Sequence, residues 1–283
     1  MADHTTYGLV CSELSEDLSK TNLGELKLDS FQDNSVKIKI KAASLNFPDL
    51  LMTQGKYQNR PDLPFALGME GAGIVEKVGS GVSSFKEGDE VMFGGWGHGA
   101  IAESIILPEG LVSLKPKSLN FSEAASFKTA YLTAYVGLIR RGELKQGETL
   151  LVHGASGGVG MAAVQMGKLY GAKVIASGTS DEKLKIVKTW GADEIINTGL
   201  EGSVSFREEV KELTDGKGAD VIYDPVGGDV FDESIRCINW GGRLLIIGFT
   251  SGRIPTVPVN YPLIKGFSVI GVRAGEFGRR DPE

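Results

Sequence analysis

The chain has 283 residues, which predicts about two domains at roughly 150 residues each. Apolar residues make up 41 % and charged residues 23 %, a globular composition that excludes a disordered or fibrous chain. The net charge of −6 leaves no basic footprint for nucleic acid, and no apolar run reaches the roughly 18 residues of a membrane span. Cys11 and Cys237 lie far apart, and the first residues lack a secretory signal. We therefore expect a cytoplasmic protein without nucleic-acid or membrane partners.

The first predicted domain, residues 1–118, consists of short strands separated by turns. Residues 36–41 alternate apolar and charged side chains, as a half-buried strand does, and residues 71–79 and 90–93 are further strand candidates. Such short strands predict a β-rich domain, either a small barrel or a sandwich.

The second predicted domain, residues 119–283, alternates strands with helices. An Ala-rich helix is expected over 122–140; Ser180 is expected to cap a later helix, and Ser205 and Glu208 have the spacing of a capping box. The predicted strands cover residues 149–153, 173–177, 221–223, 244–247 and 267–272. Because helices separate them, they predict a parallel, doubly wound sheet, and the fold class is α/β.

A glycine-rich turn follows the strand 149–153. The stretch 154–160 has glycines three residues apart, at 154, 157 and 160, and also contains Ser156, Gly158 and Val159. Without a Cβ, Gly157 and Gly158 let the backbone approach a pyrophosphate at the helix N-terminus, and Gly160 lets the helix pack closely. The strand–turn–helix context favours a dinucleotide site over an ordinary tight turn.

The end of the next strand indicates which dinucleotide is bound. NAD-specific sites place a carboxylate there for the ribose 2′-hydroxyl. This chain has Ser177, Gly178 and Thr179 instead, with Lys183 one turn into the following helix. A neutral loop beside a lysine predicts NADP(H); the alternative is that Lys183 is only a solvated surface charge.

Five segments together resemble the zinc-independent quinone oxidoreductases of the medium-chain dehydrogenase/reductase superfamily: residues 45–57, 67–75, 153–160, 223–228 and 247–252. The resemblance extends over essentially the whole chain. It implies a GroES-like catalytic domain, a Rossmann domain, NADPH in the cleft between them, and a homodimer. It also leads us to expect that a C-terminal segment returning to the first domain is missing after Glu283.

The resemblance also indicates site residues. Asn46 and Met69 stand where zinc-dependent members have a cysteine and a histidine ligand, so no zinc site is expected. Asn46 is expected near the nicotinamide, or else only as a turn residue. Tyr57 is expected to line the substrate cleft or to be a packed aromatic, and Lys128 to contact an anion or to be exposed. The remaining predicted cofactor contacts are Thr133, Asn197, Val226, Gly248, Phe249 and Thr250.

The predicted function is an NADPH-dependent transfer of hydride to a quinone without a metal ion. The cofactor carries the chemistry, and a conjugated acceptor takes hydride without strong Lewis-acid polarisation. Reduction of an α,β-unsaturated carbonyl (enone, alkenal or enoyl) is an alternative, and a non-catalytic NADPH-binding protein is another. The proton donor is either Tyr57 or solvent.

Overall fold

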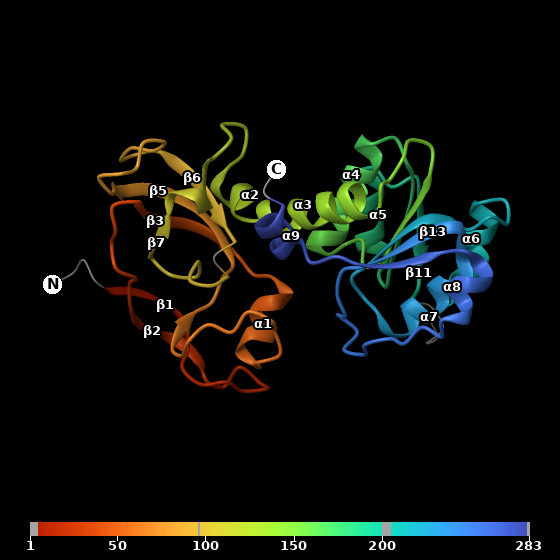
Figure 1. The fold of residues 1–283 in the computed structure, drawn as a ribbon, viewed down its shortest axis with the longest axis horizontal. Coiled ribbons are helices and arrows are strands. Elements are labelled where there is room, and N and C mark those ends of the chain that lie inside the picture. Colours follow the sequence, from red (N-terminus) through yellow and green to blue (C-terminus); the bar gives the residue numbers. More distant parts are fainter. Residues whose placement is uncertain (1–4, 96, 200–204, 282–283) are drawn as a thin grey trace. The chain divides into compact units, whose positions relative to one another are not determined.

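The computed structural model describes residues 5–95, 97–199 and 205–281, and the chain forms two compact units, residues 1–129 and 130–283 (Figure 1). The predicted domain boundary after residue 118 falls before α2 (Phe121–Ala125). This helix packs on strands of the first unit, so the compact unit extends beyond that position.

The first unit contains two antiparallel sheets. Val36 and Ile38 are buried while Lys39 and Lys41 are exposed, which confirms the alternating strand predicted there. The three-stranded sheet has the order β2 (Thr21–Lys27), β1 (Thr5–Cys11), β4 (Phe65–Ala66). The five-stranded sheet has the order β7 (Ser104–Pro108), β3 (Ser35–Ser44), β5 (Glu70–Val78), β6 (Glu90–Gly94), β8 (Val112–Leu114). The helical segments are α1 (Phe47–Thr53), η2 (Glu109–Leu111) and α2.

The second unit is built on a six-stranded parallel sheet. Its order is β11 (Glu194–Asn197), β10 (Lys173–Gly178), β9 (Thr149–Val152), β12 (Ala219–Asp224), β13 (Ile238–Ile246), β14 (Ser268–Gly271). Its helices begin with α3 (Lys128–Tyr135), which leads directly into the π-helical η3 (Val136–Arg141). They continue in chain order with α4 (Gly158–Leu169), α5 (Asp181–Thr189), α6 (Arg207–Leu213), α7 (Gly228–Cys237), α8 (Asn260–Lys265) and α9 (Ala274–Arg280). Among the described residues, no helix is long and apolar enough to cross a membrane.

Helices cover both faces of this sheet. Leu150 and Val152 of β9 pack with α3, α4 and α5, whereas Leu151 between them packs with Phe206 and with Phe231 of α7. Since successive strand residues point to opposite faces, this confirms the doubly wound arrangement. The strand order reverses between β9 and β12, the position where such sheets bind ligands beyond the carboxyl ends of their strands.

Two local predictions were wrong. The helix expected over 122–140 is divided into α2, α3 and η3: α2 ends at its C-cap Ser126, whose backbone (φ −101°, ψ 8°) is not helical, and residues 136–141 are π-helical. The capping box at Ser205 does not form, since α6 begins after Phe206, whose ring is buried in the core. The N-cap predicted at Ser180 is confirmed: its side chain accepts from a backbone N–H of α5.

Candidate functional site

The glycine-rich turn between β9 and α4 has two kinds of glycine. At Gly160, an added Cβ would overlap the carbonyl oxygen of Gly154 and lie 2.8 Å from Ala155 Cα, so only glycine fits there. At Gly158, the first residue of α4, an added Cβ would meet nothing within 4 Å. Gly160 therefore serves the packing of the turn, while Gly158 leaves open space at the start of the helix.

This open space lies at the positive end of a 12-residue helix. The first N–H groups of an α-helix have no partner inside the helix, and the helix dipole favours an anion beside them. Ser156, Gly157 and Gly158 are exposed, and the first turn of α4 carries no acidic residue. These features fit a dinucleotide pyrophosphate, which needs backbone donors and close approach.

The turn after β12 packs beside the glycine-rich turn. A Cβ on Gly154 would lie 3.3 Å from Val226 Cγ2, which places Val226 next to that turn. Asp224 Oδ1 accepts hydrogen bonds from the N–H groups of Val226 (2.8 Å) and Gly227 (2.9 Å). The Asp224 carboxyl is buried, and this burial raises its pKa although the two hydrogen bonds act in the opposite direction. Asp224 therefore holds the turn that presents Val226.

The segment after β13 completes this edge. The Gly248 N–H donates to Asp224 O (3.4 Å), and the N–H and hydroxyl of Thr250 both donate to Pro225 O at 3.1 Å. Phe249 lies so close that a Cβ on Gly227 would be 2.9 Å from its ring. The structure thus brings four predicted cofactor residues together: Val226, Gly248, Phe249 and Thr250.

The end of β10 differs from the prediction in one respect. Ser177 is buried, and its hydroxyl is 2.7 Å from Nδ1 of His153, so this hydroxyl is engaged inside the fold and is not directed to solvent. Thr179 and Lys183 are exposed. The polar groups available for a ligand are therefore those of the following loop and Lys183.

The other two predicted contacts of this unit are placed as follows. Asn197 Nδ2 donates to Asp181 Oδ1 (2.6 Å), and its Oδ1 accepts from the Gly199 N–H (2.9 Å), so its side chain joins β11 to α5. Thr133 is half-buried on α3. The contacts of both residues with a cofactor stay predictions.

In the first unit, Glu70 organises a polar cluster that sequence reasoning missed. Its side chain is buried, Oε1 accepts from Ser44 Oγ (2.7 Å) and Asn46 Nδ2 (2.9 Å), and Oε2 accepts from the Thr129 N–H (2.7 Å). Asn46 Nδ2 also donates to Ser44 Oγ at 3.1 Å. The amide group of Asn46 is therefore fixed with its NH₂ toward Glu70. The sequence feature that could have indicated this cluster is the acidic residue Glu70 at the start of a glycine-rich apolar strand.

Asp49 fixes the backbone at Asn46. Its Oδ2 accepts from the Asn46 N–H (2.8 Å) and its Oδ1 from the Gly68 N–H (2.9 Å), with the carboxyl buried in α1. Burial raises the pKa of Asp49, and the nearby charge of Glu70 raises it further. Asn46 is consequently held through both its backbone and its side chain.

Three further predicted residues have clear surroundings. Tyr57 is half-buried and packs on the apolar cluster that includes Met52, together with Met69. Lys128 is half-buried, and its Nζ donates to Leu111 O at 3.4 Å. Burial lowers the pKa of Lys128, while Glu70 acts in the opposite direction. Of the two alternatives for Lys128, full exposure is excluded.

Metal-binding side chains do not gather anywhere in the described parts of the chain. Within them, no group of three or more His, Cys, Asp or Glu residues could hold a metal ion. Cys11 and Cys237 are free and buried, and burial raises the pKa of the Cys237 thiol to about 12. His4 lies outside the described residues.

Comparison with known proteins gives consistent matches over both units. Residues 32–117 match the family described as "Alcohol dehydrogenase GroES-like domain", and residues 158–282 match "Zinc-binding dehydrogenase". A relative in Nematostella vectensis, "Quinone oxidoreductase-like protein 2 homolog", is 38 % identical over 276 residues, which are 97 % of this chain and 74 % of the relative.

Solved structures give the same result. The Escherichia coli quinone oxidoreductase complexed with NADPH is 30 % identical with a TM-score of 0.84, covering 96 % of this chain and 82 % of that one. The CurK enoyl reductase is 28 % identical with a TM-score of 0.85, covering 99 % and 84 %. These likenesses confirm a GroES-like fold followed by a Rossmann fold.

Proposed function

Because the chain belongs to the quinone oxidoreductase family of the medium-chain dehydrogenase/reductase superfamily, we propose that it is an NADPH-dependent oxidoreductase that reduces a quinone without a metal ion. The observation that carries the proposal is the open space above Gly158 at the positive end of α4. A pyrophosphate requires open space beside the backbone N–H groups at the start of a helix, and a turn that only joins a strand to a helix does not require it.

The residues of the second unit have distinct parts in holding the nucleotide. The backbone N–H groups at the start of α4 bind the pyrophosphate, and Thr179 and Lys183 bind the 2′-phosphate. Val226 lies beside the glycine-rich turn, and Phe249 and Thr250 pack on the turn after β12; these three residues contact the rest of the nucleotide. When bound, the nicotinamide ring supplies the hydride. The NADPH complex of the E. coli relative supports this choice of cofactor.

The proposal of metal independence rests on Asn46 and Met69, neither of which is a zinc ligand of the usual kind. Because the NH₂ group of Asn46 donates to Glu70 and Ser44, its Oδ1 is the atom that can accept a hydrogen bond from cofactor or substrate. Tyr57 is proposed as a cleft residue, with either its phenol or solvent supplying the proton to the reduced product.

Reduction of an α,β-unsaturated carbonyl is the second candidate, and the likeness to an enoyl reductase favours it. Both acceptors take hydride at an electron-poor conjugated carbon, so the same cofactor site serves either. We also propose a homodimer that pairs along β14, the edge strand of the parallel sheet, where Val269 is 37 % exposed. Light scattering of the purified chain tests this, and a monomer at all concentrations would contradict it.

The test of function is NADPH oxidation with a panel of simple benzoquinones, naphthoquinones, enones and alkenals. Turnover of quinones above enones is expected. The opposite order would select the second candidate, and tight NADPH binding without turnover of either class would show a non-catalytic protein. Gly158→Ala ties the activity to this site, because it should raise the KM for NADPH while leaving the fold intact.

A further inference from the structure

His153, the last residue before the glycine-rich turn, is completely enclosed. It is 1 % exposed, its Nδ1 lies 2.7 Å from Ser177 Oγ, and its Nε2 lies 2.8 Å from Ser234 Oγ. The ring also packs on Phe206, with 4.8 Å between ring centroids. Three separate elements, β10, α7 and the segment before α6, therefore fix one imidazole.

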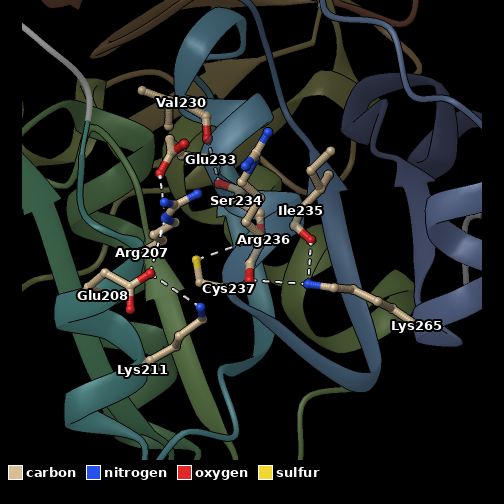
Figure 2. A network of polar contacts seen from close by, with 10 residues as sticks. All are labelled: Arg207, Glu208, Lys211, Val230, Glu233, Ser234, Ile235, Arg236, Cys237 and Lys265. Carbon is tan, nitrogen blue, oxygen red and sulfur yellow. Dashed lines mark hydrogen bonds and ion pairs between the residues drawn. The ribbon is translucent and has the colours of Figure 1, made fainter.

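The hydrogen bonds around this ring determine where its proton lies. The Ser234 hydroxyl donates to Val230 O at 2.7 Å, as Figure 2 shows within α7. Its oxygen is therefore the acceptor for Nε2–H of His153, and Nδ1 accepts from the Ser177 hydroxyl. Every polar hydrogen of the set then has an acceptor with a neutral ring. Burial lowers the pKa of His153 to about 3, so the ring stays neutral near pH 7.

This neutral ring joins the parts of the chain that would hold the cofactor. On one side it is adjacent to Gly154 of the glycine-rich turn; on the other it holds Ser177, which precedes the loop 178–180. The Ala155 N–H also donates to Ser177 O (3.0 Å), which joins the same two segments through their backbones. The third partner, α7, is anchored at its far end by Lys265, whose Nζ donates to Ile235 O and Arg236 O (Figure 2).

We propose that His153 is a positioning residue for cofactor choice: through Ser177 it sets the place of the loop 178–180 relative to the glycine-rich turn, and so maintains the preference for NADPH over NADH. The inference rests on the proposed function, because it assigns the 2′-phosphate to that loop and the pyrophosphate to the turn. His153 itself touches neither phosphate in this account.

Comparing the binding of NADPH and NADH distinguishes this role from a general loss of structure. NADPH and NADH differ only in the 2′-phosphate, so a shifted 178–180 loop weakens NADPH binding and leaves NADH binding nearly unchanged. A charge-assisted hydrogen bond that is lost or misaligned corresponds to roughly a tenfold change in affinity. We therefore expect the ratio of the NADH and NADPH dissociation constants to fall about tenfold.

The experiment compares His153→Gln, Ser177→Ala and the double variant by titration with each nucleotide. The matched control is Thr214→Ala: this buried hydroxyl donates to Val210 O (2.7 Å) and accepts from the Gly218 N–H (2.9 Å), at the end of α6. Both single variants should lower the NADPH preference by the same factor, and the double variant no further. Thr214→Ala should lose thermal stability but keep the wild-type preference.

Two results would overturn the inference. If Ser177→Ala lowers the preference and His153→Gln does not, Ser177 acts directly on the cofactor. If both variants weaken NADPH and NADH equally, His153 is merely structural. Failure of the proposed function is distinguishable, because it appears in the wild-type chain: either no nucleotide binds, or NADPH binds without turnover of any acceptor. Should His153→Gln not fold, an unchanged NADPH preference in Ser177→Ala would still overturn the inference.

Discussion

Two substitutions in the glycine-rich turn should have opposite effects on folding and binding. Gly158→Ala adds a methyl group where nothing lies within 4 Å, at a backbone conformation that L-residues adopt. Alanine is favoured over glycine within helices by roughly 0.5–1 kcal/mol, so the free energy of unfolding should stay constant or rise slightly. The same methyl occupies the space required by a pyrophosphate. Losing one charge-assisted hydrogen bond costs about 1.5–3 kcal/mol, which weakens NADPH binding about ten- to hundredfold.

Gly160→Ala acts in the reverse sense. Its Cβ would overlap the Gly154 carbonyl oxygen, and backbone cannot yield as a flexible side chain does. Overpacking of this kind typically costs about 1–3 kcal/mol of stability. Thermal unfolding and fluorescence titration with NADPH measure both quantities on the same samples. Wild-type NADPH affinity in a folded Gly158→Ala chain would refute the placement of the pyrophosphate.

Further predictions follow from other contacts. Lys183→Ala should weaken NADPH binding about ten- to hundredfold and leave NADH unaffected; equal losses for both in calorimetric titration would assign Lys183 to structure. Glu70→Gln should lower the free energy of unfolding by about 1.5–3 kcal/mol and reduce turnover. The reason is that the amide NH₂ of glutamine cannot accept hydrogen bonds, whereas both Glu70 oxygens accept from Ser44, Asn46 and Thr129. An unchanged chemical denaturation curve would contradict this. The pKa of His153 is about 3 in the folded chain and 6.5 as its ordinary value, so protonation of this ring favours the unfolded chain below pH 6.5. The free energy of unfolding of the wild type should therefore fall with decreasing pH by up to about 1.4 kcal/mol per pH unit relative to His153→Gln. Parallel plots of unfolding free energy against pH for the two chains would contradict this. Elemental analysis should find no stoichiometric zinc, and about one zinc per chain would contradict the metal-free account.

The sequence was sufficient to predict those strands whose pattern of apolar and polar side chains indicates which faces are buried. The alternation at 36–41 predicted a strand with one covered face, and the apolar runs of β9, β10 and β12 predicted a parallel sheet covered on both faces. The glycine spacing placed the turn before α4 for a similar reason, since only glycine fits at Gly160. Sheet order and register depended on contacts between distant strands, which no local pattern contains.

The polar clusters could not be predicted in this way. Glu70 is joined to Ser44 across two paired strands and to Thr129 from a segment far along the chain. His153 looked like an ordinary strand residue, and its partners Ser177 and Ser234 lie 24 and 81 residues away. The Ser177 hydroxyl was expected to face a phosphate together with the loop that follows it; instead it lies inside the fold, 2.7 Å from Nδ1 of His153.

The most direct test of the central claim is the stoichiometry of NADPH and quinone in one reaction. The purified chain is mixed with NADPH and a benzoquinone in the presence of a metal chelator, and both NADPH loss and quinol formation are followed. The account predicts equal amounts of NADPH consumed and quinol formed, with no effect of the chelator and little reaction when NADH replaces NADPH. A rate no higher than that without protein, or one abolished by the chelator, would contradict it.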